Sequence, residues 1–216
     1  MDKREIEILV PVFLFLLVLI TKIPSFSLPY YWDDFNYVIP AVDHVFKSEV
    51  TPFLWEYGLG HPPFFYLLGG LIFRIFGDSL IVSHLIIVIF SFLSIYFTYL
   101  IGKQLFNKRT AIIASLLLLF TPMFFSFSGL FNLEMPLTAF IIISLYFLII
   151  NKYLLYTLFA SLAVLTKETA IGVVLTILFI KILKEKTKLK IALIYSVPIL
   201  FFLLWIMLIK IHYGLF

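Results

Sequence analysis

Long apolar runs separated by short polar segments repeat along the whole chain. Seven of these runs fit helices that cross a membrane, at about residues 6–22, 80–101, 111–127, 135–150, 153–165, 170–182 and 191–209. A helix needs roughly 20 mainly apolar residues to span a bilayer. The pattern therefore predicts an all-α polytopic membrane protein with about seven transmembrane helices, in a single module over residues 1–216.

The first apolar run also has some features of a secretory signal peptide. Charged residues precede it within positions 1–5, as they do in such peptides. The segment that follows, residues 21–24, is Thr-Lys-Ile-Pro and offers no small-x-small cleavage site. We therefore expect a retained first helix with its N-terminus in the cytoplasm.

A further apolar run, residues 62–76, decides the orientation of the later helices. It would measure only about 22 Å as a helix, and it contains Gly69, Gly70 and Arg74. If it does not cross, 11 Lys and Arg residues are cytoplasmic and 5 are outside; if it crosses, the split roughly reverses. Cytoplasmic loops are enriched in Lys and Arg, so we expect a juxtamembrane or re-entrant helix within a long outer loop over residues 24–79. The expected cytoplasmic set is Lys3, Arg4, Lys103, Lys108, Arg109, Lys152, Lys181, Lys184, Lys186, Lys188 and Lys190, and the outer set is Lys22, Lys47, Arg74, Lys167 and Lys210.

Composition agrees with this class and excludes others. Hydrophobic residues make up 63% of the chain and charged residues 13%, against roughly 45–50% and 25% in soluble domains. A soluble globular enzyme, a disordered tail and a surface-lying amphipathic peptide are thereby excluded. The absence of cysteine excludes disulfides, thiolate chemistry and cysteine-ligated metal. The net charge of +4 fits cytoplasmic loops, without the basic cluster of a nucleic-acid-binding module.

The predicted orientation collects the unusual polar residues on the outer face. Asp33 and Asp34 follow an aromatic segment at the end of the first helix, and Lys167 and Glu168 form a turn between two short helices. Those helices would rise only about 20 Å in a hydrocarbon core of about 30 Å, so the turn would be recessed. A recessed charge suggests a functional site. The candidate site residues are Asp33, Asp34, His61, Glu134, Lys167 and Glu168.

Each candidate also has a purely structural explanation. The two aspartates would be solvated loop charges, and Glu134 would favour the positive end of a helix dipole. Lys167 and Glu168 would form an ion pair that closes a hairpin, and His61 would only precede a helix start. Their convergence on one face favours a site.

Several of these segments resemble motifs of GT-C glycosyltransferases. The segments around Asp33-Asp34 and around His61-Pro62-Pro63 resemble the Asp-Glu and His-Pro-Pro-Leu motifs of the protein mannosyltransferase and lipid A aminoarabinose transferase group. Three further segments resemble, in the same order and spacing, an LFG-D/N-S element, a second acidic motif and an LTK-E/G turn, at residues 71–79, 131–137 and 165–168. In the second acidic motif Glu134 stands where the family usually has Asp.

The resemblance implies an enzyme that moves a sugar from a polyprenyl-phosphate donor to an acceptor hydroxyl at the outer face, with inversion. Such chemistry needs a carboxylate base and cations near the leaving phosphate. By motif position Asp33 would be the base, with Asp34 at the position of the usual Glu, and only one of these adjacent side chains should face the acceptor. The substrate-binding candidates are His61 and Lys167, both for phosphate, Glu134, for acceptor, donor or a divalent metal, and Glu168.

The implied partners are a polyprenyl-phosphate-linked sugar, membrane lipids, and a lipid, glycan or protein acceptor. Family members usually carry a C-terminal outer domain, and we expect this chain to contain only the shared transmembrane module, as a minimal enzyme, a fragment, or a subunit completed by a second chain. The expected location is the cell membrane, with the active face extracytoplasmic. Two alternatives stay open: a transporter or flippase for a lipid-linked sugar, and a non-catalytic subunit.

Overall fold

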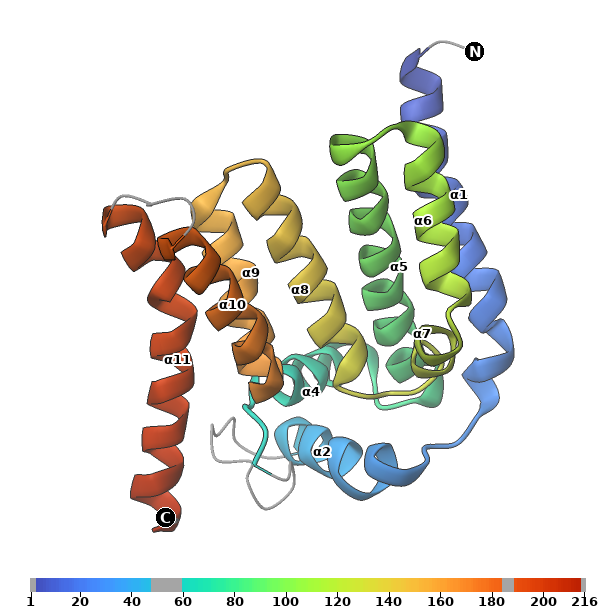
Figure 1. Cartoon of the computed structure of the whole chain (residues 1–216). Coiled ribbons are helices and arrows are strands. Elements are labelled where there is room, and N and C mark those ends of the chain that lie inside the picture. Colours follow the sequence, from blue (N-terminus) through green and yellow to red (C-terminus); the bar gives the residue numbers. More distant parts are fainter. Residues whose placement is uncertain (1–2, 48–59, 184–188, 215–216) are drawn as a thin grey trace.

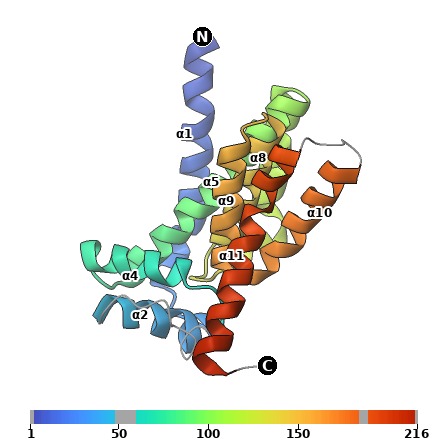
Figure 2. The ribbon, with the colours of Figure 1, turned by 90° about the vertical axis from the view of Figure 1, so that its left-hand side faces the viewer.

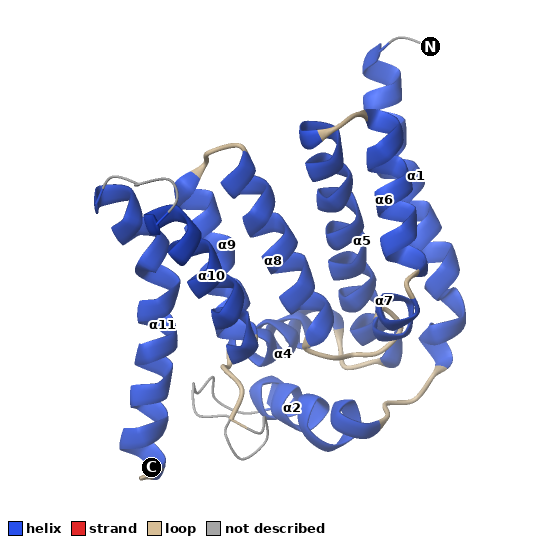
Figure 3. Ribbon diagram, viewed as in Figure 1, coloured by secondary structure: helices blue, strands red, loops and turns tan. Residues whose placement is uncertain are grey.

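The computed structural model describes residues 3–47, 60–183 and 189–214, and these residues form helices and connecting turns without a strand (Figures 1 and 3). The α-helices, with three short 3-10 or π segments (η1–η3), are α1 Lys3–Lys22, η1 Ile23–Ser27, η2 Asp34–Val38, α2 Ile39–Lys47, α4 Phe64–Phe76, α5 Leu80–Leu105, α6 Lys108–Phe120, α7 Pro122–Phe127, α8 Glu134–Ile149, α9 Tyr153–Thr166, η3 Glu168–Ala170, α10 Ile171–Leu183 and α11 Leu189–Tyr213.

The prediction of an all-α membrane protein is confirmed. Among the described residues, three spans are long and apolar enough to cross a bilayer, Leu9–Ser27, Leu80–Leu105 and Ile191–His212. Shorter apolar helices include α8 and α9, which pack against each other, and α5 packs against both α6 and α8. A helix lies over each of the seven predicted segments. That each of the shorter ones crosses the membrane stays a prediction.

One predicted helix is divided in two. The segment at residues 111–127 was expected to be continuous, but α6 ends at Phe120 and α7 begins at Pro122. Thr121 between them is extended, with φ −62° and ψ 125°. The cause is local, because the ring of Pro122 disfavours the helical conformation of the residue before it. The break turns α7 toward the end of the bundle where the candidate site lies (Figure 1).

The helices run up and down between two ends of the bundle. The turns that join α5 to α6 and α8 to α9 lie at the same end as the start of α1, whereas the α9–α10 turn lies at the opposite end (Figures 1 and 2). This alternation is what the predicted orientation requires, since it separates Lys103, Lys108 and Lys152 from Lys167. Three of the expected cytoplasmic charges, Lys184, Lys186 and Lys188, lie outside the described residues.

Helices α2 and α4 lie across the far end of the bundle instead of along its axis (Figures 1 and 2). They pack closely, because a Cβ on Gly70 would come within 2.5 Å of the Val45 side chain. Arg74 donates from Nη2 to the Val45 carbonyl at 2.6 Å, which satisfies a carbonyl in the last turn of α2. The buried Phe131 ring stacks on Phe73 and joins α4 to the loop before α8. These contacts hold α2 and α4 over the end of the bundle. That this segment is a juxtamembrane loop at the outer face stays a prediction.

Candidate functional site

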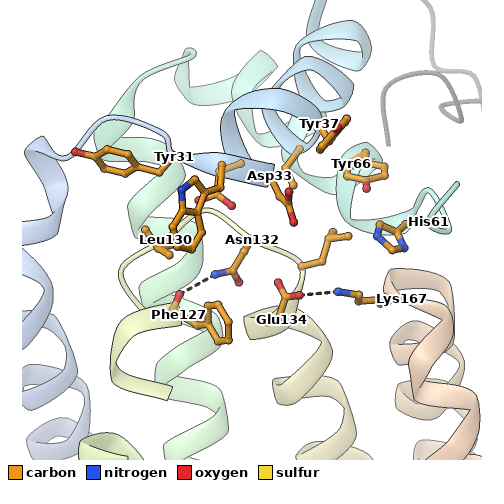
Figure 4. Close-up of a pocket in the computed structure, with 14 residues that line it drawn as sticks. Tyr31, Asp33, Tyr37, His61, Tyr66, Phe127, Leu130, Asn132, Glu134 and Lys167 are labelled. Atoms are coloured by element: carbon orange, nitrogen blue, oxygen red, sulfur yellow. Dashed lines mark hydrogen bonds and ion pairs between the residues drawn. The ribbon is translucent and has the colours of Figure 1, made fainter. Parts of the chain in front are cut away.

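A cavity of about 250 Å³ opens at the end of the bundle covered by α2 and α4 (Figure 4). Its walls come from the segment around η2, the residues before α4, the loop from α7 to α8, and the end of α9. The lining residues are Tyr31, Trp32, Asp33, Asp34, Tyr37, Val38, His61, Tyr66, Phe127, Leu130, Asn132, Leu133, Glu134 and Lys167. The cavity thus brings together five of the six site residues expected from the sequence.

The two adjacent aspartates lie in different surroundings at the start of η2. Asp33 is exposed and its carboxylate points toward the middle of the cavity (Figure 4), whereas Asp34 is buried. The turn is held by the Asp34 backbone N–H, which donates to the Tyr31 carbonyl at 3.0 Å. The two adjacent side chains therefore differ: the carboxylate of Asp33 is accessible and that of Asp34 is enclosed.

The pKa of Asp34 is raised to about 7. Burial is the largest cause, since it penalises the charged form, and the nearby carboxylates of Glu134 and Asp33 add repulsion. A backbone hydrogen bond at Phe131 acts in the opposite direction. A carboxyl with this pKa changes its protonation state near neutral pH.

Glu134 and Lys167 form an ion pair on the cavity wall. Lys167 Nζ donates to Glu134 Oε1 at 2.6 Å, and the side chains are 21% and 35% exposed. Glu134 is the first residue of α8, and Lys167 directly follows the last residue of α9. The start of α8 is capped by Asn132, whose Oδ1 accepts from the Met135 backbone N–H at 3.2 Å. The sequence offered Glu168 as the nearest partner of Lys167, but the observed partner comes from another helix.

Glu168 instead pairs with His61. His61 Nδ1 and Glu168 Oε2 are 2.8 Å apart, which joins the segment before α4 to the α9–α10 turn. The carboxylate of Glu168 fixes the orientation of the imidazole, and the ring of His61 also lines the cavity. Glu168 is the one expected site residue that is not part of the cavity wall, and it reaches the cavity only through His61.

The cavity has two chemically different ends. His61 and Lys167 lie at one end, Tyr31 and Leu130 at the other, and Asp33, Asn132 and Glu134 between them (Figure 4). One end therefore suits an anion, the middle offers hydrogen-bond acceptors, and the other end offers apolar surface. Within the described residues, no group of three or more acidic or histidine side chains is arranged to hold a metal ion. A divalent metal at Glu134 stays a prediction.

Several lining residues were missed from the sequence. Asn132 was only part of a quoted motif, and Tyr37 and Tyr66 were not singled out. The aromatic segment before Asp33 was the available signal for Tyr31 and Trp32, because it directly precedes a candidate site residue. Tyr66 gave no signal of this kind, because a tyrosine in an apolar run is most simply read as core.

The sequence of this all-helical chain matches one known family of membrane enzymes. The sequence profile of the dolichyl-phosphate-mannose-protein mannosyltransferase family matches residues 60–210. The chain belongs to this family, and it is a membrane glycosyltransferase of the GT-C type. Comparison with curated proteins and with solved structures finds no match. The matched residues include His61, Glu134, Lys167 and Glu168, whereas Asp33 and Asp34 precede them.

Proposed function

We propose that the chain transfers a sugar from a polyprenyl-phosphate donor to an acceptor hydroxyl at the outer face of the membrane, with Asp33 as the general base. The observation that carries the proposal is one cavity that joins an exposed carboxylate, Asp33, to two groups suited to phosphate, Lys167 and His61. The type of donor, the type of acceptor, the side of the membrane and the role of each residue are all parts of the proposal.

The proposed reaction is a single displacement at the anomeric carbon. The acceptor oxygen forms the new bond to this carbon as the bond to the phosphate oxygen breaks, and polyprenyl phosphate leaves with the electron pair. Asp33 takes the proton of the attacking hydroxyl. Attack from the side opposite the leaving group inverts the anomeric centre.

Asp33 is a better candidate for the base than Asp34. Its side chain is exposed within the cavity, whereas Asp34 is buried and its pKa is raised to about 7. An acceptor hydroxyl can therefore reach the Asp33 carboxylate, whereas the enclosed Asp34 carboxyl is shielded from it. We assign Asp34 a positioning role, in which it keeps the start of η2 in place and acts on the reaction through Asp33.

The cationic end would stabilise the leaving phosphate. Lys167 and His61 lie together at this end, where negative charge develops on the phosphate oxygen as the bond breaks (Figure 4). Glu134 and Glu168 hold these two groups through contacts of 2.6 Å and 2.8 Å. In this proposal Glu168 is a positioning residue for His61, whereas Glu134 is the counter-ion of Lys167 in the absence of donor and is replaced there by the donor phosphate.

The apolar helices would place the protein in the cell membrane with the cavity on the extracytoplasmic side and the N-terminus in the cytoplasm. Its partners would be membrane lipids, the lipid-linked sugar and an acceptor, with a second subunit as a further partner if an outer domain is needed.

The test uses the full chain in lipid nanodiscs with radiolabelled polyprenyl-phosphate mannose. The acceptors are a panel of methyl glycosides and serine- or threonine-containing peptides. We expect label on an acceptor with inverted configuration, and one polyprenyl phosphate released for each sugar transferred. Asp33→Asn should abolish both. Donor that is bound or moved between leaflets of a vesicle but never cleaved would contradict the proposal and favour the transporter.

A further inference from the structure

Trp32 has an unusual conformation beside the proposed base. Its side chain is 85% exposed and its φ is +47°, in the left-handed region that bulky residues rarely adopt. It directly precedes Asp33 and lines the same cavity. Folding of the chain does not account for this indole, because an exposed side chain contributes little to a core.

Local hydrogen bonds hold the backbone of Trp32 in this conformation. Asn36 Nδ2 donates to the Trp32 carbonyl at 2.8 Å, and the backbone N–H of Asp34 donates to the Tyr31 carbonyl at 3.0 Å. Strained backbone of this kind persists where the surrounding structure enforces it, and it is concentrated at ligand-binding sites. The turn therefore fixes a large aromatic face at the mouth of a polar cavity.

The surroundings of Trp32 match the two chemical sides of a sugar ring. Tyr31, Phe127 and Leu130 also line the cavity and add aromatic and apolar surface, while Asp33 and Asn132 offer oxygen acceptors. A pyranose has one face of C–H groups, which suits the electron-rich face of an aromatic ring. Its edge carries hydroxyl groups, which suit carboxylate and amide oxygens.

The position of Trp32 selects the acceptor over the donor. Lys167 and His61 lie at the opposite end of the cavity from Tyr31, which directly precedes Trp32 in the chain (Figure 4). If the donor phosphate binds there, the donor sugar occupies the middle of the cavity, and the end next to Trp32 is left for the group that attacks.

We propose that Trp32 is the stacking platform for a pyranose acceptor, so that the chain glycosylates a saccharide, as a glycan or a glycolipid head group, in preference to a serine or threonine side chain. This inference rests on the proposed function for the identity of the reaction, but the binding of a saccharide at Trp32 is independent of it.

Binding is tested by fluorine NMR of the full chain labelled with 5-fluorotryptophan in nanodiscs free of glycolipid. The chain has 3 tryptophans, and the Trp32 signal is the one lost in Trp32→Phe. We expect a methyl pyranoside, from a panel of mannose, glucose, galactose and N-acetylglucosamine, to shift this signal. Mannitol, which has the hydroxyl groups without the ring, should leave it in place. A Trp32 signal that no pyranoside shifts, or that a threonine peptide shifts instead, would overturn the inference.

Kinetics provide a second readout with a matched control. Trp32→Ala should raise the acceptor KM by about 3- to 10-fold, the effect of one lost aromatic contact, without changing the donor KM. Trp32→Tyr should have an acceptor KM close to that of the parent protein. Phe35→Ala is the control, because Phe35 is 64% exposed on the same turn but does not line the cavity. Equal effects of both alanine variants would identify Trp32 as a membrane anchor and contradict the stacking role.

The two proposals fail separately. Transfer to a peptide with no effect of Trp32→Ala would remove the saccharide acceptor and leave the transferase. A pyranoside that binds at Trp32 in a protein that never cleaves the donor would remove the transferase and leave the binding site.

Discussion

Replacing Lys167 by alanine should weaken donor binding much more than it slows transfer at saturating donor. Lys167 Nζ contacts Glu134 at 2.6 Å and its side chain is 21% exposed, so it is partly shielded from water. A hydrogen bond to a charged group is worth about 1.5–3 kcal/mol, which corresponds to roughly 10- to 100-fold in Kd. We therefore expect the Kd for polyprenyl-phosphate mannose to rise by that factor in Lys167→Ala.

Companion variants separate the charge of Lys167 from its contribution to folding. Lys167→Arg keeps the charge and should keep a substantial part of the affinity. Glu134→Gln removes the anion that competes with the donor phosphate. Because a partly exposed ion pair is worth only about 0.2–1 kcal/mol, this variant should bind donor up to about 5-fold more tightly. The gain should disappear when Lys167 is already alanine, since Glu134 acts through Lys167.

The assay is equilibrium binding of radiolabelled polyprenyl-phosphate mannose to protein in nanodiscs, with transfer rates measured on the same samples. Size-exclusion profiles in detergent report folding. If Lys167→Ala is poorly folded while its folded fraction binds donor as the parent does, Lys167 is only structural. If Glu134→Gln loses as much affinity as Lys167→Ala, the ion pair is required to build the donor site, and displacement of Glu134 by phosphate is wrong.

Three further predictions concern pH, strain and orientation. Because the pKa of Asp34 is raised from 3.8 to about 7, its contribution to stability is complete below about pH 4 and is lost as the pH rises through 7. Asp34→Asn should flatten this decline, which is worth about 4 kcal/mol at most, in thermal melts from pH 4 to 8. An unchanged slope would refute the raised pKa of Asp34. Trp32→Gly relieves the left-handed backbone, so its melting temperature should not fall below the parent's, although its acceptor KM rises; a clear loss of stability would show that the indole supports the fold. A cysteine at Phe106 should resist an impermeant thiol reagent in intact cells while one at Asp78 reacts, and equal labelling would contradict the orientation.

Local features of the fold were predictable because they depend on sequence alone. The apolar runs predict the helices, and Gly69, Gly70 and Arg74 indicated that residues 62–76 would not form an ordinary spanning helix. Pro122 carries the signal for the break between α6 and α7. Hydropathy alone does not register this break, because apolar residues continue on both sides of the proline.

The contacts within the site could not be predicted from the sequence. Lys167 pairs with Glu134, 33 positions away, and this choice depends on how α8 and α9 pack. The contact between His61 and Glu168 spans 107 positions and depends on the placement of α4 across the bundle end. The left-handed φ of Trp32 has no signature in residue type, because tryptophan rarely adopts it. The residue identities therefore indicated that a site exists, whereas its internal pairing required the packed structure.

If Asp33 is the base of a glycosyl transfer, its loss must slow the chemical step, and single-turnover transfer by Asp33→Asn measures that step. Parent and variant are loaded with labelled polyprenyl-phosphate mannose, mixed with an acceptor that the parent uses, and sampled over time, with donor Kd measured in parallel. Loss of a general base should slow transfer by about 10²- to 10⁴-fold and leave the donor Kd unchanged, because Asp33 lies away from the cationic end of the cavity. Transfer by Asp33→Asn at the rate of the parent protein would contradict the account.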